Sequence, residues 1–434
     1  MTMLINKENG EYGTFKDSKK APIHRWFEYP AGYSPKLVYE KIKQFNLNAN
    51  CTIFDPFLGC GTTCLAAKEH GVSCIGIEAH SFVADIAKAK LYWDYNFQKL
   101  EQEYSDIIFK WIYDKEVQKS AEENFYILPQ LVKKCYSKNN LLNLLRIKLA
   151  IKKASHNVMN AAFFNLALTS TLRVSSTAGT GWPYIAPTKY HRKKTEKEAI
   201  EAFKRQYNLM VTDIKEVLKK TDKPGATRVI AGDARMLHDI APDSIDLAIT
   251  SPPYLNNFDY ADRTRLETYF FGITNSWAEI TAKYRDHLIV AATTQTKRTG
   301  FAPENCICKE LRTVSPMLSA EIIKKVIELS EKRLQKGGKK SYDVMVAQYF
   351  NDMFPIIKNT FLYLREGGAF VLVLGDSAPY GVHIPTETYI GDLGKSIGFK
   401  RYEIEELRKR GGKWAKNPQR HSVILRESIL TLIK

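Results

Sequence analysis

The chain has 434 residues, of which 44% are hydrophobic and 26% charged, and these proportions exclude a disordered polypeptide. Residues 1–20 are polar and the most apolar run, 158–174, is interrupted by asparagine and threonine, so neither a signal peptide nor a membrane span is expected. Seven scattered cysteines without the paired spacing of zinc ligands favour a reduced, cytoplasmic protein with no disulfide framework and no metal site.

The formal net charge is +17, and the charge is unevenly placed along the chain. Residues 131–195 contain twelve lysines and arginines but no aspartate or glutamate. A solvated surface normally mixes both signs, so this block favours a polyanionic partner, with a basic surface kept for solubility as the alternative. The candidate nucleic-acid-binding residues in the block are Lys152, Lys153, Arg173, Lys189, Arg192, Lys193 and Lys194.

The N-terminal elements begin with a loose arm over residues 1–20. The aromatic segment 24–33 is expected either to line a pocket or to fold on to the core as a plain surface loop. Ser34 and Pro35 are typical of an N-cap and a first helical residue, and they predict a helix that continues through Phe45.

A unit of strand, turn, helix and strand follows over residues 51–78. An apolar strand runs into the glycine-rich turn Asp55–Thr63 (DPFLGCGTT), a helix is predicted over 64–70, and a second strand over 72–77 ends at Glu78. Glycines let the backbone approach a ligand closely, and a helix N-terminus offers free N–H groups. A carboxylate at the end of the second strand can accept hydrogen bonds from both hydroxyls of a ribose. The unit therefore predicts an adenosine-binding site.

Residues 91–221 are expected to be mainly helical with a loop in the middle. Helices are predicted over 139–153, with a buried face and a basic flank, and over 196–219, with mixed charge. The loop, 175–190, contains aromatic residues and leads into the basic run 189–194. This composition suits phosphate contact with base stacking, and a surface loop with its aromatics folded inward is the alternative.

Two further strands precede the segment on which the predicted chemistry depends. The third strand, 229–231, ends at Asp233, and the fourth, 244–249, runs into Thr250-Ser251-Pro252-Pro253-Tyr254. Two prolines fix two φ angles and remove two donors, which leaves a stiff segment with free carbonyl acceptors. Ligands of open α/β sheets bind beyond the carboxyl ends of strands. The segment therefore suits a flat group that carries an amine, with a simple strand terminator as the alternative.

The remainder of the chain is predicted to return to the core after a second insertion. The expected elements are a helix over 263–271, an insertion over 272–340 with a helix at 319–334, a helix over 342–364 broken by Gly367 and Gly368, a strand over 369–374, a helix over 386–397, and two strands over 401–407 and 422–433 that flank a basic loop, 408–416.

Three of the predicted strand ends resemble motifs of one enzyme family, the S-adenosylmethionine-dependent amino-methyltransferases of DNA. Asp55–Thr63 is similar to the family's cofactor motif, and Ser251–Tyr254 resembles its catalytic tetrapeptide. Ala231–Arg235 resembles the acidic motif that contacts the adenine of the cofactor. The resemblance covers residues 25–95, 228–270 and, less specifically, 345–434.

The resemblance implies an α/β fold of the Rossmann-like class I methyltransferase type. Such a fold has a mostly parallel seven-stranded sheet with a C-terminal antiparallel hairpin, here with a mainly helical inserted region. It also implies S-adenosylmethionine as the cofactor, double-stranded DNA as the partner, no metal and no membrane, and it leaves room for a cognate restriction endonuclease. The implied cofactor-binding residues are Asp55, Pro56, Phe57, Gly59, Gly61, Thr62, Glu78, Asp233 and Ala234.

The implied catalytic residues are Ser251, Pro252, Pro253 and Tyr254. The Ser251 hydroxyl and the Pro252 carbonyl would hold the amine of a flipped-out base, and Tyr254 would stack on that base. In the family, serine at the first position goes more often with cytosine N4, and aspartate or asparagine with adenine N6. Cytosine N4 is therefore favoured and adenine N6 is the alternative. An RNA base amine and an inactive nucleic-acid-binding protein are further alternatives.

The motifs divide the chain into five regions. These are the N-terminal arm with the cofactor-binding half of the core, 1–95, a basic and mainly helical insertion, 96–225, the catalytic strand with its tetrapeptide, 226–271, a second insertion, 272–340, and the second half of the core, 341–434. Charge assigns recognition of the target sequence to 96–225, and 272–340 is the alternative.

Overall fold

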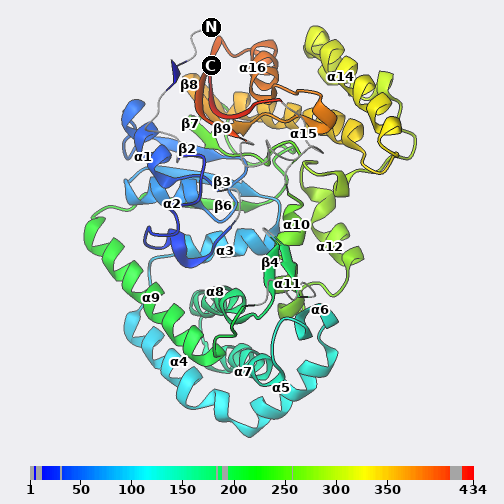
Figure 1. The fold of residues 1–434 in the computed structure, drawn as a ribbon. Coiled ribbons are helices and arrows are strands. Elements are labelled where there is room, and N and C mark those ends of the chain that lie inside the picture. Colours follow the sequence, from blue (N-terminus) through cyan, green and yellow to red (C-terminus); the bar gives the residue numbers. More distant parts are fainter. Residues whose placement is uncertain are drawn as a thin grey trace.

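The computed structural model describes residues 4–5, 12–29, 32–181, 184–187, 194–256, 258–410 and 423–434. A twisted sheet with helices on both faces forms the core, and a separate layer of helices packs below it (Figure 1). Within the described ranges, no helix has the length and apolar character that crossing a bilayer requires.

The central sheet has eight strands in the order β1-β9-β10-β8-β7-β2-β3-β6. Five neighbouring strands are parallel, and β10 is antiparallel to both β8 and β9. The predicted seven-stranded, mostly parallel sheet with a C-terminal antiparallel hairpin is thus confirmed, and a two-residue strand, β1, extends its edge beside β9. The strands are β1 (Leu4–Ile5), β2 (Thr52–Asp55), β3 (Ser73–Glu78), β6 (Thr227–Ala231), β7 (Ile245–Thr250), β8 (Leu364–Gly375), β9 (Arg401–Arg410) and β10 (Leu425–Ile433).

The strands at the centre of the sheet are apolar on both faces because helices cover both faces. On one face lie α1 (Pro35–Gln44), α2 (Thr62–Glu69) and α3 (Ser81–Leu91), and on the other lie α15 (Tyr342–Tyr363) and α16 (Thr386–Ile397). All six residues of β7 are buried. Its charged residue, Asp246, accepts a hydrogen bond from Thr52 N at 2.6 Å and pairs with Arg365.

The first insertion forms the helical layer that packs against α3 through α8. The apolar run of the sequence is α8, which lies among α3, α7 and α9 and is buried by them. The helices of this layer are α4 (Phe97–Phe109), α5 (Lys115–Ile127), α6 (Gln130–Lys133), α7 (Lys138–Ala154), α8 (Val158–Ser175) and α9 (Ala199–Lys220).

The second insertion begins after two short helices that follow β7, and it ends in a long helix, α14, that packs along α15. Its α-helices and those before it are α10 (Tyr260–Arg263), α11 (Arg265–Phe271), α12 (Trp277–Lys283), α13 (Lys309–Val314) and α14 (Pro316–Gln335). The 3-10 turns are η2 (His24–Trp26), η3 (Trp111–Tyr113), η5 (Arg285–His287), η6 (Thr293–Gln295), η7 (Pro303–Asn305) and η8 (Pro379–Gly381).

Several sequence-based expectations about these elements were wrong in detail. The loop expected over 175–190 contains an antiparallel hairpin of β4 (Gly179–Gly181) and β5 (Tyr184–Ala186). Gly367 and Gly368 were expected to break the helix over 342–364, but both lie inside β8. Gly367 takes φ 76°, and the pairing of β8 with β7 shifts register at this point. The helix expected over 263–271 is α11, which begins at Arg265, and a short helix, α10, precedes it.

Candidate active site

The carboxyl ends of β2, β3, β6 and β7 meet at one edge of the sheet, and a pocket lies at that edge. Residues from the cofactor-like turn, the end of β3, the end of β6 and the tetrapeptide all line it. Motifs far apart in the sequence therefore share one cavity. The predicted residues in its wall are Pro56, Phe57, Gly59, Thr62, Glu78, Asp233, Ala234, Ser251 and Pro253.

Asp55 does not line the pocket, but its carboxyl group connects the two segments that carry the cofactor-like turn and the tetrapeptide. Its Oδ1 accepts hydrogen bonds from Thr250 Oγ1 at 2.6 Å and from Phe57 N at 2.9 Å. Its Oδ2 accepts from Thr63 Oγ1. Burial raises the pKa of Asp55 to about 6. One carboxyl group thus joins the end of β7 to the turn after β2.

The glycine-rich turn requires residues without a side chain at two positions. Gly59 has φ 55° and Gly61 has φ 94°, both in the left-handed region that glycine enters without strain. Gly61 is the N-cap residue of α2 and does not line the pocket, whereas Gly59 does. The first glycine therefore brings backbone to the cavity, and the second starts the helix.

Glu78 ends β3 with its carboxyl group in the wall of the pocket. Gly59 N donates to its Oε2 at 2.8 Å and His80 N donates to its Oε1 at 2.8 Å. Burial raises the pKa of this carboxyl group to about 7. Each carboxylate oxygen can accept more than one hydrogen bond, so the group can hold further donors while it keeps the turn in place.

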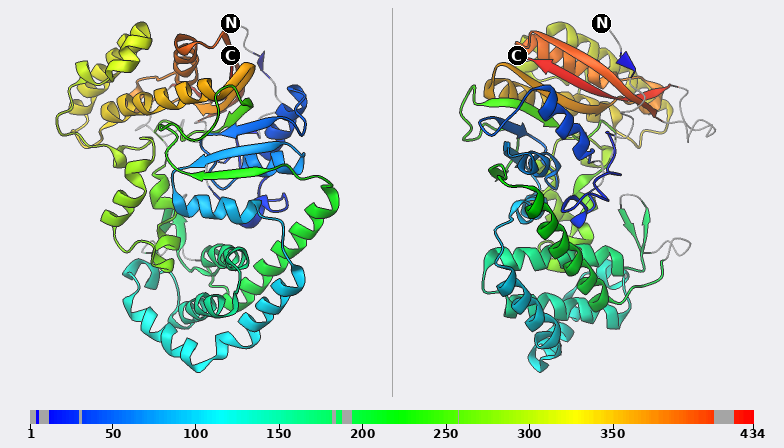
Figure 2. Two further views of the ribbon diagram at one scale, coloured as in Figure 1. Left: turned by 180° about the vertical axis from the view of Figure 1, so that it is seen from behind. Right: turned by 90° about the vertical axis from the view of Figure 1, so that its left-hand side faces the viewer.

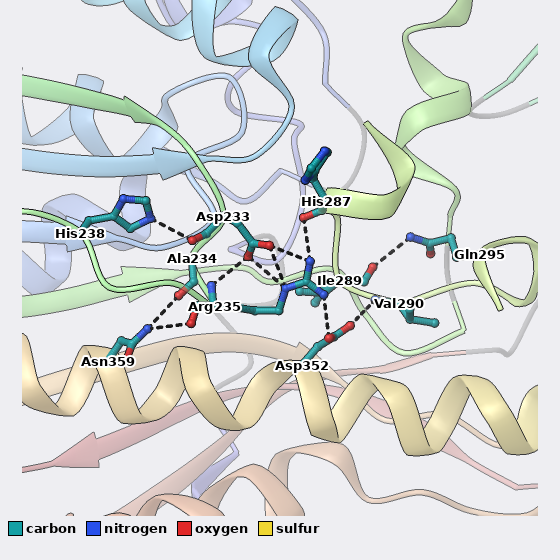
Figure 3. A network of polar contacts seen from close by, with 10 residues as sticks. All are labelled: Asp233, Ala234, Arg235, His238, His287, Ile289, Val290, Gln295, Asp352 and Asn359. Atoms are coloured by element: carbon teal, nitrogen blue, oxygen red, sulfur yellow. Dashed lines mark hydrogen bonds and ion pairs between the residues drawn. The ribbon is translucent and has the colours of Figure 1, made fainter. Parts of the chain in front are cut away.

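Arg235 organises the side of the pocket that β6 contributes (Figure 3). Its guanidinium lies between two carboxylates, with Nη2 2.6 Å from Asp233 Oδ2 and Nη1 2.7 Å from Asp352 Oδ1 on α15. Asp352 Oδ2 in turn accepts from Val290 N at 2.9 Å, and Arg235 Nη2 donates to the His287 carbonyl at 3.3 Å. The network holds part of the second insertion at the pocket.

Some residues that line the pocket were not singled out from the sequence. The aromatic segment before α1 contributes Tyr29, Gly32 and Tyr33, as one of its two interpretations predicted. Tyr260, on α10, lies with its ring centroid 6.3 Å from that of Tyr29. The segment 287–289 carries no sequence signal for this position, since only the contacts of Arg235 and Asp352 place it there.

The tetrapeptide divides between the pocket and the neighbouring terminal hairpin. Ser251 and Pro253 line the pocket, whereas Pro252 and Tyr254 are buried and do not. The Tyr254 hydroxyl is hydrogen-bonded with Ser251 and donates to Glu427 Oε1 at 3.0 Å. The guanidinium carbon of Arg410 lies 5.2 Å from the Tyr254 ring centroid. Tyr254 therefore has neighbours within the protein at both its ring and its hydroxyl, and its predicted stacking on a base stays a prediction.

The predicted nucleic-acid-binding residues differ in how free their charges are. Lys152 and Lys153 are exposed at the end of α7, and Lys153 Nζ lies 2.8 Å from Glu116. Lys194 is exposed. The remaining basic residues of this run, Lys189, Arg192 and Lys193, lie outside the described residues, as do most of the basic loop between β9 and β10 and the aromatics Trp182 and Tyr190.

The Arg173 guanidinium forms an internal ion pair, and its predicted contact with nucleic acid stays a prediction. Its Nε lies 2.5 Å from Glu267 Oε1, and its Nη2 donates to the Arg263 carbonyl at 2.5 Å. Glu267 is fully buried. The position of Arg173 on an acid-free helix did not reveal this partner, because Glu267 lies on α11 and meets α8 only in the folded chain.

The hairpin of the basic insertion contacts the loop that follows the tetrapeptide. The Tyr184 hydroxyl, on β5, accepts a hydrogen bond from Asp259 N at 2.8 Å. In the right-hand view of Figure 2, the β4–β5 hairpin projects to the same side as the end of β9 and the start of β10. The hairpin of the insertion therefore lies against the segment between the tetrapeptide and α10.

No group of histidine, cysteine, aspartate and glutamate in the described part of the chain is arranged to hold a metal ion. The acidic groups of the pocket are instead engaged by backbone N–H groups and by Arg235, as described above.

Comparisons with known proteins agree with this arrangement. A family model described as DNA methylase, of the N6/N4 type, matches residues 5–89. The chain is 25% identical to the Type II methyltransferase M.BsoBI of Geobacillus stearothermophilus over 453 residues, which cover 97% of this chain and 87% of that protein. It is 23% identical to M.AvaI of Nostoc sp. over 90% of this chain and 82% of that one. It is also 23% identical to M.MvaI of Kocuria varians over 94% of this chain and 87% of that one.

Proposed function

Because the chain belongs to the N6/N4 family of DNA amino-methyltransferases, we propose that it methylates the exocyclic N4 amine of cytosine in DNA. The relatives are named Type II methyltransferases, and their similarity spans both insertions as well as the sheet. That extent favours a Type II DNA methyltransferase of the N4/N6 family. The choice of cytosine N4 is the part that we propose.

The observation that carries the proposal is the composition of one pocket. Ser251 and Pro253 line the same cavity as Gly59, Glu78 and Asp233. A cofactor site and an amine-holding site must adjoin for direct transfer, since proximity and in-line orientation supply most of the rate in such a reaction.

The side chains of the pocket fit the methyl donor that the family implies. S-adenosylmethionine supplies an electrophilic methyl group on a sulfonium when it is bound. Glu78 would accept hydrogen bonds from the ribose hydroxyls, and Asp233 would face the adenine amine. Phe57, Ile77 and Ile356 provide apolar surface for a flat ring in the wall of the same pocket. Neither Glu78 nor Asp233 has to leave its present partners to accept one more donor.

The amine of a base is a weak nucleophile because its lone pair is delocalised into the ring. Acceptors on the amine hydrogens would localise that lone pair and aim it at the methyl group. We assign this role to the Ser251 hydroxyl and the Pro252 carbonyl. Within the described residues no hydrogen bond reaches the Pro252 carbonyl, which therefore has no protein donor. A base inside a duplex has to be flipped out to reach these groups.

Serine at the first position of the tetrapeptide supports cytosine N4, and adenine N6 is the second candidate. Mass spectrometry of nucleosides from unmethylated DNA treated with the enzyme and cofactor decides between them. We expect N4-methylcytosine. N6-methyladenine would overturn the base assignment, and the absence of any methylated nucleoside, with cofactor binding measured by calorimetry, would overturn the enzymatic function. The same assay on RNA tests the RNA alternative.

The relatives' designation as Type II methyltransferases extends the proposal to restriction-modification. In that setting methylation of the target sequence would block a cognate endonuclease. A DNA pool treated with the enzyme and then challenged with restriction endonucleases would show protection at one sequence only.

A further inference from the structure

A second cavity, of about 690 Å³, lies between the helical layer and the segment that leads into the first pocket. Residues of η2 and its neighbours form one side, and residues of α8, α9 and the segment before α9 form the other. Six cations line it, whereas Glu28 is its one acidic lining residue within the described chain. The cations are Lys19, Arg25, Arg173, Lys194, Lys197 and Arg263.

The carboxylates near these cations do not balance their charge. Glu28 lies 3.3 Å from Lys19, and Asp213 lies 2.5 Å from Arg25. Among the described residues, Lys194 and Lys197 form no ion pair. Both of these lysines are exposed and border the cavity. An excess of positive charge therefore faces its opening.

One buried carboxylate forms ion pairs with two of the guanidinium groups. Glu267 Oε1 lies 2.5 Å from Arg173 Nε and 3.1 Å from Arg263 Nη1. Burial and the neighbouring charge of Arg173 lower the pKa of Arg263 to about 10. An anion in the cavity would offset this repulsion between like charges.

The cavity also holds a polar group without a partner. The amide nitrogen of Gln206, on α9, is shielded from solvent and makes no hydrogen bond. A buried donor in that state costs free energy unless a ligand or a water satisfies it. The excess cations match a phosphate, which carries charge and several acceptor oxygens, and a turn of the Gln206 side chain toward the cavity would add a donor to them.

The cavity adjoins the reaction centre on the side of the basic insertion. Phe27 and Glu28 line this cavity, while Tyr29 lines the first pocket. Arg263 is on α10, directly after the tetrapeptide loop, and donates to the Glu28 carbonyl at 2.6 Å. Lys194 lies a few residues beyond the β4–β5 hairpin that contacts that loop.

We propose that this cavity binds a backbone phosphate of the DNA strand that carries the target base. The inference rests on the proposed function and adds the phosphate contact to it. A phosphate held here would orient the strand for a base that enters the first pocket, because backbone contacts set register while base contacts specify sequence.

The test replaces both exposed lysines in the variant Lys194→Gln/Lys197→Gln. DNA affinity is measured as a function of salt concentration, and cofactor affinity is measured by calorimetry. The matched control is Lys324→Gln/Lys336→Gln, which removes the same charge from exposed lysines of the α14 region, on the other side of the sheet. We expect the slope of log affinity against log salt to fall in size by about one for the cavity variant, with unchanged cofactor affinity.

Equal slopes for the cavity variant and the control would overturn the proposal. Inorganic phosphate distinguishes the source of the anion. If phosphate stabilises the wild type in thermal unfolding but not the cavity variant, while DNA affinity is unchanged in that variant, the cavity serves a free anion and the proposal fails. A wild-type protein that binds cofactor but neither binds nor methylates DNA would instead refute the proposed function itself.

Discussion

At the scale of single residues, the site depends on carboxyl groups that hold the backbone and also connect a second strand or line the pocket. Asp55 supports the turn after β2 and also holds the end of β7 through Thr250. Glu78 supports the same turn and lines the pocket. Since these groups have internal partners already, changes at them are expected to affect structure and binding together. Ser251 lines the pocket as well, and its partner is the Tyr254 hydroxyl.

Ser251→Ala should abolish most methylation and leave cofactor affinity near that of the wild type. Loss of one preorganised polar contact to the reacting group typically costs about 10²–10³ in kcat. The measurement is single-turnover methylation with calorimetric cofactor binding as the control. Unchanged turnover would contradict the role assigned to this hydroxyl.

Tyr254→Phe distinguishes a stacking role from a positioning role. The phenylalanine keeps the ring but removes the hydroxyl that joins Ser251 to Glu427. We expect kcat to fall about tenfold, the order of one lost hydrogen bond, with KM for DNA unchanged. Full activity in this variant, together with loss in Tyr254→Ala, would support stacking instead.

The pKa of Glu78 predicts that cofactor affinity depends on pH. Burial raises that pKa to about 7, so the group is mainly protonated at pH 6, whereas ribose hydroxyls bind best to its ionised form. Binding should therefore release a proton, and affinity should rise about tenfold between pH 6 and pH 8. Calorimetry in buffers of different ionisation enthalpy measures the release. In Glu78→Gln this contribution should vanish, and a retained proton release would assign it to another group.

At the scale of elements, a network centred on Arg235 and Asp352 connects the second insertion to the pocket. Arg235 connects the end of β6, α15 and the segment 287–290, and that segment supplies part of the pocket wall. The insertion and the core thus meet through charge-assisted hydrogen bonds, which are stronger than neutral ones.

Arg235→Ala should weaken cofactor binding by about tenfold or more, since it leaves two carboxylates close together and releases the segment 287–290. Hydrogen exchange should increase in that segment. The matched control is Arg228→Ala on β6, which removes an exposed ion pair with Asp239, and there both quantities should stay unchanged. Equal cofactor affinity in the two variants would contradict the role of the network.

At the scale of the whole molecule, α9 and the N-terminal segment are joined by one buried carboxylate. Asp213 accepts hydrogen bonds from Ile23 N, Arg25 Nε and Trp26 Nε1, each at 3.0 Å. The helical layer is thereby attached to the segment that lines both cavities.

Asp213→Ala should lower the free energy of unfolding by about 3 kcal/mol, because it leaves buried donors and a guanidinium without an acceptor. Thermal unfolding and hydrogen exchange in residues 21–29 report the change. Asp222→Ala, at an exposed position after the same helix, should stay within about 0.5 kcal/mol of the wild type. A similar result for both variants would show that the attachment lies elsewhere.

Sequence reasoning determined those features that depend on local backbone chemistry. The glycine-rich turn, the two prolines of the tetrapeptide and the acid at the end of β3 lie where strand ends were predicted, because glycine and proline act through their own φ angles. The resemblance to the methyltransferase family also implied the parallel sheet with its antiparallel C-terminal pair, which the structure has. These local signals are enough to locate one pocket.

Only the tertiary structure decided which charged and aromatic side chains are free to act. Arg173 reads as a surface cation in the sequence but pairs with Glu267, which lies more than ninety residues further along the chain. Tyr254 follows the two prolines and yet meets Glu427 on β10, while Arg235 fixes a distant insertion. Such pairs form between residues remote in sequence, and their partners are set by how helices and strands pack rather than by neighbouring residue types.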